Sequence, residues 1–455
     1  MKRAPLVTVY ITNYNYGQYI RKAIESVLSQ TIEDFELIII DDGSLDDSKL
    51  IIEEYSSKDN ISIIYQHNKG LNKTNNVALK ASKGKYIMRL DADDFLEPTA
   101  LEDMSNELEK DDELGLIFPN YYLVDKDGIV VSETKRHDFK KEVNILDQPA
   151  HGACTMIRVN FLKALEGYDE SFTCQDGYEL WVKFVGNYKV TNINKTLFSY
   201  RRHNNNLTNN EARILGTRIK IKEKYVNKEN LSLPNTAGVI ALRPNHPLTF
   251  EKFGDATFLD FKISQFLNAK KLDYVIVVSS DIAIEEYVKK QYSNQKVNFF
   301  IRPETLERIN VSLFDTMLFL DEKEELKDVE AYMFCSIEYP LLSSEIVDDS
   351  INTLAIFNAD SLVSVRPEVN KFFVHTGNGM KAILQQEKFT KLEREEIYKY
   401  SGGVILSKKS TAKENRKLIH GKVGHVVIEE KASLNAMSSF ERKLCNDLLK
   451  ENRGV

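Results

Sequence analysis

A mostly apolar run that ends in a cluster of acids occupies residues 85–98, "KYIMRLDADDFLEP". The run predicts a buried strand, and Asp91, Asp93 and Asp94 follow it directly. Carboxylates this close repel one another unless water solvates them or a cation lies among them. Two interpretations follow. The cluster is either a solvated acidic turn before a helix, whose dipole favours carboxylates, or a metal site.

Strand and helix patterns alternate around this cluster. Apolar strand patterns stand at residues 6–12, 35–41, 61–67 and 85–90, and helical spacing lies between them at 16–31, 46–58 and 73–82. The alternation predicts an α/β fold, with a Rossmann-like, mainly parallel sheet and helices on both faces. Ligands of such sheets bind beyond the carboxyl ends of the strands. Both acidic motifs, "DDGS" and "DADD", lie at such ends.

A polar, turn-rich stretch, "NKENLSLPNTAG" (227–238), separates two patterned regions of the chain. Beyond it, strand patterns recur in "GVIAL" and "DYVIVVSSD". The second region is a further α/β domain and not a copy of the first. The sequence therefore predicts two domains and a linker, at residues 1–228, 237–455 and 229–236 respectively.

The composition excludes several classes of protein. Of 455 residues, 42% are hydrophobic and 28% charged, and the formal net charge is -7, which argues against a nucleic-acid partner. The four cysteines are scattered, which predicts reduced, mostly buried thiols in a cytosolic protein. Because no apolar run approaches the length of a membrane span, we expect at most peripheral association with the inner face of the cell membrane.

The first half of the chain resembles family 2 glycosyltransferases of the GT-A fold. The resemblance rests on "VTVYITNYNYGQYIRKAIESVLSQTIEDFELIIIDDGSLDD" and "NKGLNKTNNVALKASKGKYIMRLDADDFLEP", in the family's order and spacing. It implies an inverting, metal-dependent hexosyl- or N-acetylhexosaminyltransferase that uses a UDP-sugar. The implied acceptor is a glycan or lipid-linked glycan in surface polysaccharide synthesis, such as capsule or lipooligosaccharide.

The resemblance also implies how the donor is held. Asp93 would bind a divalent cation, Mn²⁺ or Mg²⁺, that neutralises the diphosphate as the glycosidic bond breaks. Asp91 would contact the ribose, or the metal through water. Thr12 and Tyr14 would line the base pocket, and Asp42 would accept a hydrogen bond from N3–H of uracil.

One position departs from the family near this site. Many relatives carry an arginine in the segment that here reads "KTNN", where Asn75 takes its place. Lys73 is the candidate substitute, although a lysine lacks the bidentate fork of an arginine. His203, in "YRRHNNNLT", is a candidate third metal ligand or phosphate donor, and a surface-loop role is the alternative.

The acceptor side is assigned from "LEGYDESFTCQDGYELWVKF" (165–184). Asp176 is the candidate general base, which would take the proton from the acceptor hydroxyl. A helix N-cap is the alternative role for Asp176. Glu179 is the rival acid, Trp181 belongs to the same supporting helix, and His151 is assigned to the acceptor floor.

The second half resembles cytidylyltransferases of the acylneuraminate type, but it departs from them at the functional positions. The nucleotide loop reads "RPNHPLTFEKFGD", and two prolines remove backbone donors from it. Asn435 and Met437 replace acids that bind Mg²⁺ in the family. We therefore expect a degenerate domain. The formation of a homo-oligomer through this domain is left open. The alternatives are a bifunctional protein that also activates a nonulosonic acid as its CMP-sugar, and a non-catalytic sugar-nucleotide-binding scaffold.

Overall fold

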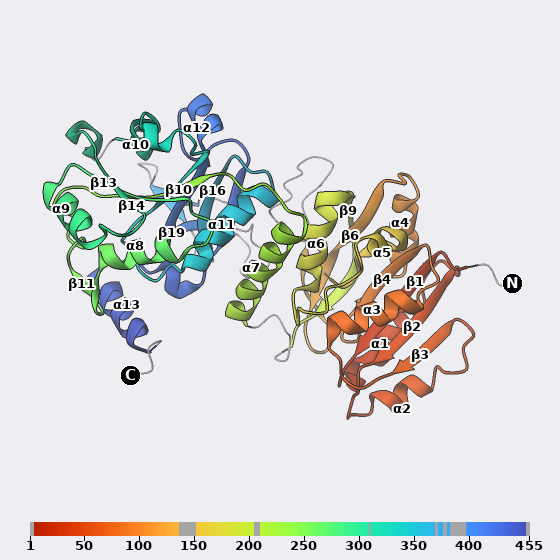
Figure 1. Ribbon diagram of the computed structural model, residues 1–455. Helices are drawn as coiled ribbons and strands as arrows, with labels where there is room; N and C mark the ends of the chain where they lie inside the picture. Colours follow the sequence, from red (N-terminus) through yellow and green to blue (C-terminus); the bar gives the residue numbers. More distant parts are fainter. Residues whose placement is uncertain are drawn as a thin grey trace. The chain divides into compact units, whose positions relative to one another are not determined.

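The computed structural model describes residues 4–135, 152–203, 210–308, 311–368, 372–375, 380–382 and 397–451. The chain forms two compact units, each with its own sheet (Figure 1). The first unit comprises residues 1–218 and 371–395, and the second comprises 219–370 and 396–455. The division falls within helix α7 (Glu211–Lys228), before the predicted linker at 229–236.

Four parallel strands form one half of the first sheet, as the sequence predicts. They run in the order β3 (Ile61–Tyr65), β2 (Phe35–Asp41), β1 (Val7–Asn13) and β4 (Tyr86–Asp91). Helices α1 (Gly17–Leu28), α2 (Ser48–Glu53) and α3 (Leu71–Ala81) connect them. The strand order reverses between β1 and β4, and such a switch point is where open α/β sheets bind ligands.

The other half of this sheet is mixed. The short strand β8 (Met156–Arg158) lies antiparallel between β4 and β6 (Leu114–Val124), and β9 (Lys189–Arg201) runs parallel to β6. Strands β5 (Phe95–Leu96) and β7 (Val130–Thr134) pair antiparallel with β9 and β6. The helices of this half are α4 (Ala100–Leu108), α5 (Val159–Ala164) and α6 (Asp176–Asn187).

The second sheet repeats the strand order of the parallel half. Its parallel strands are β14 (Val297–Ile301), β13 (Tyr274–Ser279), β10 (Thr236–Ala241) and β15 (Ala331–Cys335). Strand β19 (Ile397–Lys408) is antiparallel to β15 and to β16 (Ser361–Glu368), which pairs with β20 (Val423–Val427). The small hairpin β11–β12 (Lys252–Phe253, Ala256–Thr257) belongs to the second unit, whereas the hairpin β17–β18 (Phe373–His375, Met380–Ala382) lies in the segment assigned to the first unit. The helices are α8 (Phe258–Asn268), α9 (Ile282–Gln291), α10 (Leu313–Asp321), α11 (Ser344–Ile356), α12 (Lys409–Asn415) and α13 (Ser439–Glu451).

Each sheet buries both faces, which confirms the predicted α/β class. In β1, Val9 and Ile11 pack into one hydrophobic cluster, while Tyr10 between them packs into another on the opposite face. Full burial of an aliphatic side chain contributes roughly 1.5–3 kcal/mol, so continuous apolar strands stabilise both layers. All four cysteines are buried and unpaired. In the described ranges, every helix falls short of the length and apolarity that a membrane crossing needs.

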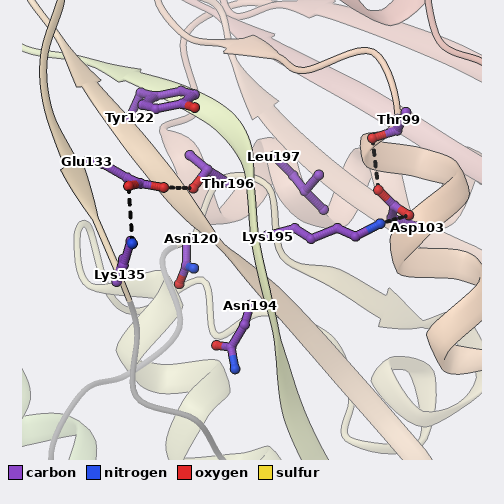
Figure 2. Close-up of a pocket in the computed structure, with 10 residues that line it drawn as sticks. All are labelled: Thr99, Asp103, Asn120, Tyr122, Glu133, Lys135, Asn194, Lys195, Thr196 and Leu197. Atoms are coloured by element: carbon purple, nitrogen blue, oxygen red, sulfur yellow. Dashed lines mark hydrogen bonds and ion pairs between the residues drawn. The ribbon is translucent and has the colours of Figure 1, made fainter.

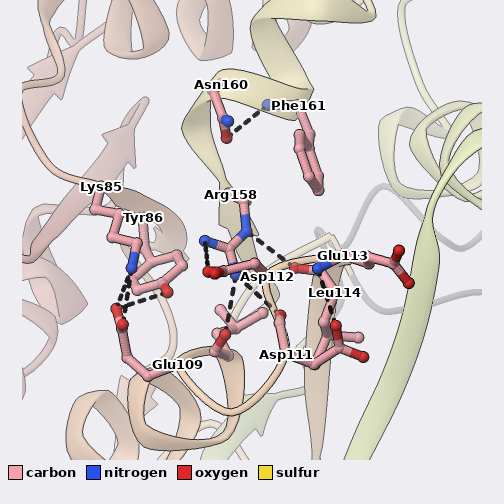
Figure 3. Close-up of polar contacts among 11 residues, drawn as sticks. Lys85, Tyr86, Glu109, Asp111, Asp112, Glu113, Leu114, Arg158, Asn160 and Phe161 are labelled. Carbon is pink, nitrogen blue, oxygen red and sulfur yellow. Dashed lines mark hydrogen bonds and ion pairs between the residues drawn. The ribbon is translucent and has the colours of Figure 1, made fainter.

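A buried arginine fixes the end of α4 against the sheet. Arg158 donates from Nε to the carbonyl oxygen of Leu114 at 3.1 Å and from Nη2 to that of Leu108 at 2.9 Å (Figure 3). A cation at a helix C-terminus satisfies terminal carbonyls and complements the helix dipole. Because its closest partners are backbone oxygens, we assign Arg158 a structural role.

Candidate active site

The carboxyl ends of β1, β2 and β4 bring the two acidic motifs to one edge of the first sheet. In the parallel register, Asn13 pairs with Asp41 on one side of β1, and Thr12 pairs with Asp91 on the other. The side chains interact as well, since Thr12 Oγ1 donates to Asp91 Oδ1 at 3.2 Å and Asn13 Nδ2 donates to Asp41 Oδ2 at 2.7 Å. The end of β1 therefore connects the motifs.

The acids after β4 are largely withdrawn from water. Asp93 is 6% exposed and Asp94 is 1% exposed, which does not match a solvated acidic turn. Burial and the neighbouring Asp91 raise the pKa of Asp93, and burial together with Asp93 raises the pKa of Asp94 well above its ordinary value. Asp94 accepts the backbone N–H of Arg201 at 2.9 Å, which ties this loop to β9. The ionised forms of these two carboxyls are therefore disfavoured, and a cation beside them would favour ionisation.

His203 faces this cluster. Its Nε2 lies 3.0 Å from Oδ2 of Asp93. This interaction opposes the rise in the pKa of the Asp93 carboxyl. The imidazole ring is also stacked on Tyr19, with centroids 5.8 Å apart, and lies 5.6 Å from the ring of Tyr16. The sequence analysis did not include these two tyrosines, of which Tyr16 is the N-cap of α1 and Tyr19 lies in its first turn.

The donor atoms suit a hard divalent cation, but they are paired with protein groups. Carboxylate oxygens of Asp91 and Asp93 and the imidazole of His203 are ligand types that Mn²⁺ accepts. Among the described residues, however, no group of three or more His, Cys, Asp or Glu side chains is placed to hold a metal ion together. The chemistry of the residues therefore fits a cation, and binding it would require that their present pairs rearrange.

Arg89 is the residue that the sequence analysis missed. It is buried in β4, its Nε lies 2.9 Å from Oδ1 of Asp91, and its Nη1 pairs with Oδ2 of Asp176. Burial lowers the pKa of Arg89, but the carboxylates of Asp176 and Asp91 outweigh it and raise that pKa well above its ordinary value. Arg89 therefore links Asp91, the last residue of β4, to Asp176, the predicted general base.

The packing around this ion pair is tight. A side chain at Gly152 would place its Cβ 2.5 Å from Nη2 of Arg89 and 2.9 Å from Oδ2 of Asp176. Only glycine fits there without displacing the pair. A charged residue inside an otherwise apolar strand was the available signal for Arg89, because a buried arginine needs a partner.

Asp176 is the first residue of α6 and is buried. The N-cap position belongs to Gln175, whose φ of 64° is left-handed, so Asp176 is not the cap. Glu179, one turn later, is buried and pairs with Lys183 on the same helix. Burial raises the pKa of Glu179, although Lys183 opposes this. Trp181 packs edge-on against Phe118 with centroids 6.0 Å apart, which gives it a supporting role in the core.

The residues predicted to contact the nucleotide base of the donor differ in exposure and in hydrogen bonding. Tyr14 is 45% exposed at the sheet edge, which leaves its ring accessible. Asp42 is buried, and its carboxylate accepts from Nε2 of Gln66 at 2.8 Å and from the backbone N–H groups of Lys69 and Gly70, both at 2.9 Å. About four acceptor positions exist on a carboxylate, so only about one remains for a ligand.

The remaining predicted site residues are Lys73 and Asn75 on α3 and His151, which precedes β8 in the sequence. Lys73 is exposed on the helix, while Asn75 is buried and accepts from the hydroxyl of Tyr10 at 3.2 Å. Asn75 therefore takes part in the core and not in the site edge. His151 lies outside the described residues.

Comparisons with known proteins identify the family of the first unit. The family model described as glycosyl transferase family 2 matches residues 8–168. Over 233 residues the chain is 33% identical to the chondroitin synthase of Escherichia coli, covering 50% of this chain and 32% of that protein. Over 237 residues it is 32% identical to an uncharacterized glycosyltransferase of Methanocaldococcus jannaschii, covering 50% of this chain and 81% of that protein. Over 208 residues it is 30% identical to the hyaluronan synthase of Pasteurella multocida, covering 45% and 21%.

A solved structure, S. aureus TarS 1-349 in complex with UDP, aligns with a TM-score of 0.41 and 20% identity, covering 49% of this chain and 66% of that chain. The chain spans about a third or less of the two named polysaccharide synthases. The family model and the sequence relatives define the protein as a glycosyltransferase. The chain belongs to glycosyltransferase family 2, and the residues that match the family model lie in the first unit.

Proposed function

We propose that the first unit transfers a sugar from a UDP-sugar to a hydroxyl of a glycan acceptor, with inversion and with the help of a divalent cation. The observation that supports this most is the arrangement of Asp91, Arg89 and Asp176, which joins a donor-side acid to an acceptor-side acid at one sheet edge. The relatives named as chondroitin and hyaluronan synthases favour polysaccharide as the product class.

In the proposed reaction, Asp176 takes the proton of the acceptor hydroxyl while the acceptor oxygen attacks C1 of the donor sugar. The bond between C1 and the diphosphate oxygen breaks, and UDP leaves with the electron pair. A single displacement of this kind inverts the anomeric centre. Arg89 pairs with the Asp176 carboxylate and so orients it.

Asp91, Asp93 and His203 would hold the cation, which supplies charge neutralisation for the leaving diphosphate. Burial raises the pKa of Asp93 and Asp94, and a cation bound beside them would offset this by favouring the ionised forms. Asp42 would contribute its remaining acceptor position to the base, and Tyr14 would contribute its exposed ring.

A donor screen tests this proposal. Purified protein is supplied with UDP-, GDP- and CMP-sugars, a mixed glycan acceptor and Mn²⁺, and release of the free nucleotide is measured. We expect UDP release that EDTA abolishes and Mn²⁺ restores. Turnover that persists undiminished after EDTA treatment and dialysis would contradict the metal role, and release of GDP or CMP alone would contradict the donor assignment.

We further propose that the second unit is a degenerate nucleotidyltransferase-like module that serves assembly, acceptor binding or recruitment. Two of its features support this. Pro244 and Pro247 provide no backbone donors in the loop after β10, and Asn435 donates to Glu338 at 3.3 Å where the family resemblance expects Mg²⁺-binding acids. Full-length protein given CTP, several nonulosonic acids and Mg²⁺ should release no pyrophosphate above a no-enzyme control. Release above that control would favour the bifunctional alternative.

A further inference from the structure

The first unit contains a second concave site, separate from the acids at the end of β4. It is a cavity of about 710 Å³, which lies within the usual size of ligand pockets. Figure 2 shows its lining from α4, β6, β7 and β9, and the lining residues are Thr99, Asp103, Asn120, Tyr122, Glu133, Lys135, Asn194, Lys195, Thr196 and Leu197.

An irregular strand pairing builds this pocket. On β6, Pro119 pairs with Ile193 and Tyr121 pairs with Phe198, so two steps on β6 match five steps on β9. The three residues of β9 without a partner in this ladder are Asn194, Lys195 and Leu197, and all three line the cavity. Bulges re-aim side chains and are frequent beside functional sites. The regular pairing of β6 with β9 is therefore interrupted where the pocket forms.

The charges of the pocket cancel within the chain. Lys195 lies 2.6 Å from a carboxylate oxygen of Asp103, and Lys135 lies 3.6 Å from one of Glu133. Figure 2 shows the amides of Asn120 and Asn194 between these two charged pairs.

The remaining lining groups are polar or aromatic. Hydroxyls of Thr99, Thr196 and Tyr122 and the aromatic ring of Tyr122 complete the surface, and Leu197 is the single aliphatic side chain among the ten. A nucleotide or phosphate would need cations that are not already paired, and an apolar ligand would need a more apolar wall. Amides, hydroxyls and one aromatic ring are groups that can hydrogen-bond and pack against an uncharged sugar.

We propose that this pocket binds neutral, hydroxyl- and acetamido-bearing sugar residues of the glycan that the first unit elongates. The pocket residues of β9 lead along that strand to Arg201, whose backbone N–H holds Asp94. At about 3.3 Å per residue, the four positions from Leu197 to Arg201 span roughly 13 Å. A glycan segment held in the pocket would keep its growing end near the acids. This inference rests on the proposed glycan acceptor and adds a subsite to it.

Binding without donor tests the subsite separately from transfer. The full chain is titrated with tetra-N-acetylchitotetraose, as a neutral probe, and with a chondroitin tetrasaccharide, as an anionic probe, and binding is followed by isothermal titration or ligand-observed NMR. Asn194→Trp places a bulky side chain in the cavity at an exposed position. Asn187→Trp is the matched control, because Asn187 is also exposed but does not line the pocket.

We expect saturable binding of the neutral probe, about tenfold weaker in Asn194→Trp and in Tyr122→Ala and unchanged in Asn187→Trp. Binding should persist in Asp93→Asn, so a failure of the proposed metal site does not affect this test. The proposal is overturned if the neutral probe does not bind, if only the anionic probe binds, or if Asn194→Trp binds as wild type does.

Discussion

The two parallel half-sheets share one strand order, but their carboxyl edges carry different side chains. In the first unit, Asp41 and Asp91 end β2 and β4, and Asp42, Asp93 and Asp94 follow them. Burial together with Asp91 raises the pKa of Asp93. In the second unit, Glu338 follows β15, and the neighbouring His246 lowers the pKa of that carboxyl. The ionised carboxylate is thus disfavoured at one edge and favoured at the other. The shared strand order supplies a place for a site, and the side chains at the strand ends decide its chemistry.

Two buried cations, Arg89 of the first unit and Lys262 of the second, differ in the same way. Arg89 lies against two carboxylates, which raise its pKa. Lys262, on α8, is fully buried and donates to the backbone oxygen of Tyr339 at 3.0 Å, and burial lowers its pKa to about 8. A cation with charged partners belongs to a polar site, whereas a cation held by a carbonyl belongs to the core.

The largest expected effect is on the acid after β4. Asp93→Asn should lower the turnover number by about a thousandfold, because the leaving diphosphate loses the charge that the cation would supply. Glu338→Gln, at the corresponding edge of the second unit, should leave transfer unchanged. The melting temperature of Asp93→Asn should not fall, since burial already raises the pKa of Asp93. Equal losses in both variants would remove the distinction between the two edges.

The next effect concerns the base. Asp176→Asn should lower kcat by about a hundredfold while UDP affinity stays near that of wild type, because a general base acts on the acceptor and not on the donor. Glu179→Gln is the comparison, since Glu179 pairs with Lys183 on its own helix. An active Asp176→Asn beside an inactive Glu179→Gln would reverse the assignment.

A smaller effect is expected at two of the buried arginines of the first unit, Arg89 and Arg158. Arg89→Lys keeps the charge but loses the fork that reaches two carboxylates, so we expect about a tenfold loss in kcat/KM. Arg158→Lys should lower the melting temperature and leave kcat/KM near wild type, because Arg158 contacts backbone oxygens. If Arg158→Lys costs as much activity as Arg89→Lys, the two arginines do not differ in role.

The sequence predicted the features that depend on local patterns. The strands β1 to β4 were predicted directly from apolar runs, and the acids at the strand ends from the residues that terminate those runs. The pairing of Arg89 with Asp176 spans 87 positions, and no local pattern encodes which buried cation meets which acid. The strand β8 has three residues, too few to show a period, and the bulge at Asn194 depends on how β6 and β9 pair. What the sequence missed therefore depends on contacts between distant segments.

The smallest expected effect tests the second cation. Because burial lowers the folded-state pKa of Lys262 to about 8 from 10.5, the unfolded chain binds more protons than the folded one above pH 8. Stability of the second unit should therefore rise with pH from 8, by about 1 kcal/mol up to pH 9. Beyond pH 9 the gain is opposed, since burial raises the pKa of Cys335 to about 12 and its thiol ionises only when unfolded.

Calorimetry between pH 7 and 10 checks this dependence, and the fluorescence of Trp181, the single tryptophan, identifies the transition of the first unit. Lys262→Met should abolish the rise in the other transition, because the side chain no longer titrates. Cys335→Ala should extend the rise above pH 9. The inference would be contradicted if the stability of the wild-type second unit stays constant between pH 8 and 9, or if its rise with pH persists in Lys262→Met. Either result would show that this lysine is charged in the folded protein and that its burial differs less from that of Arg89 than we infer.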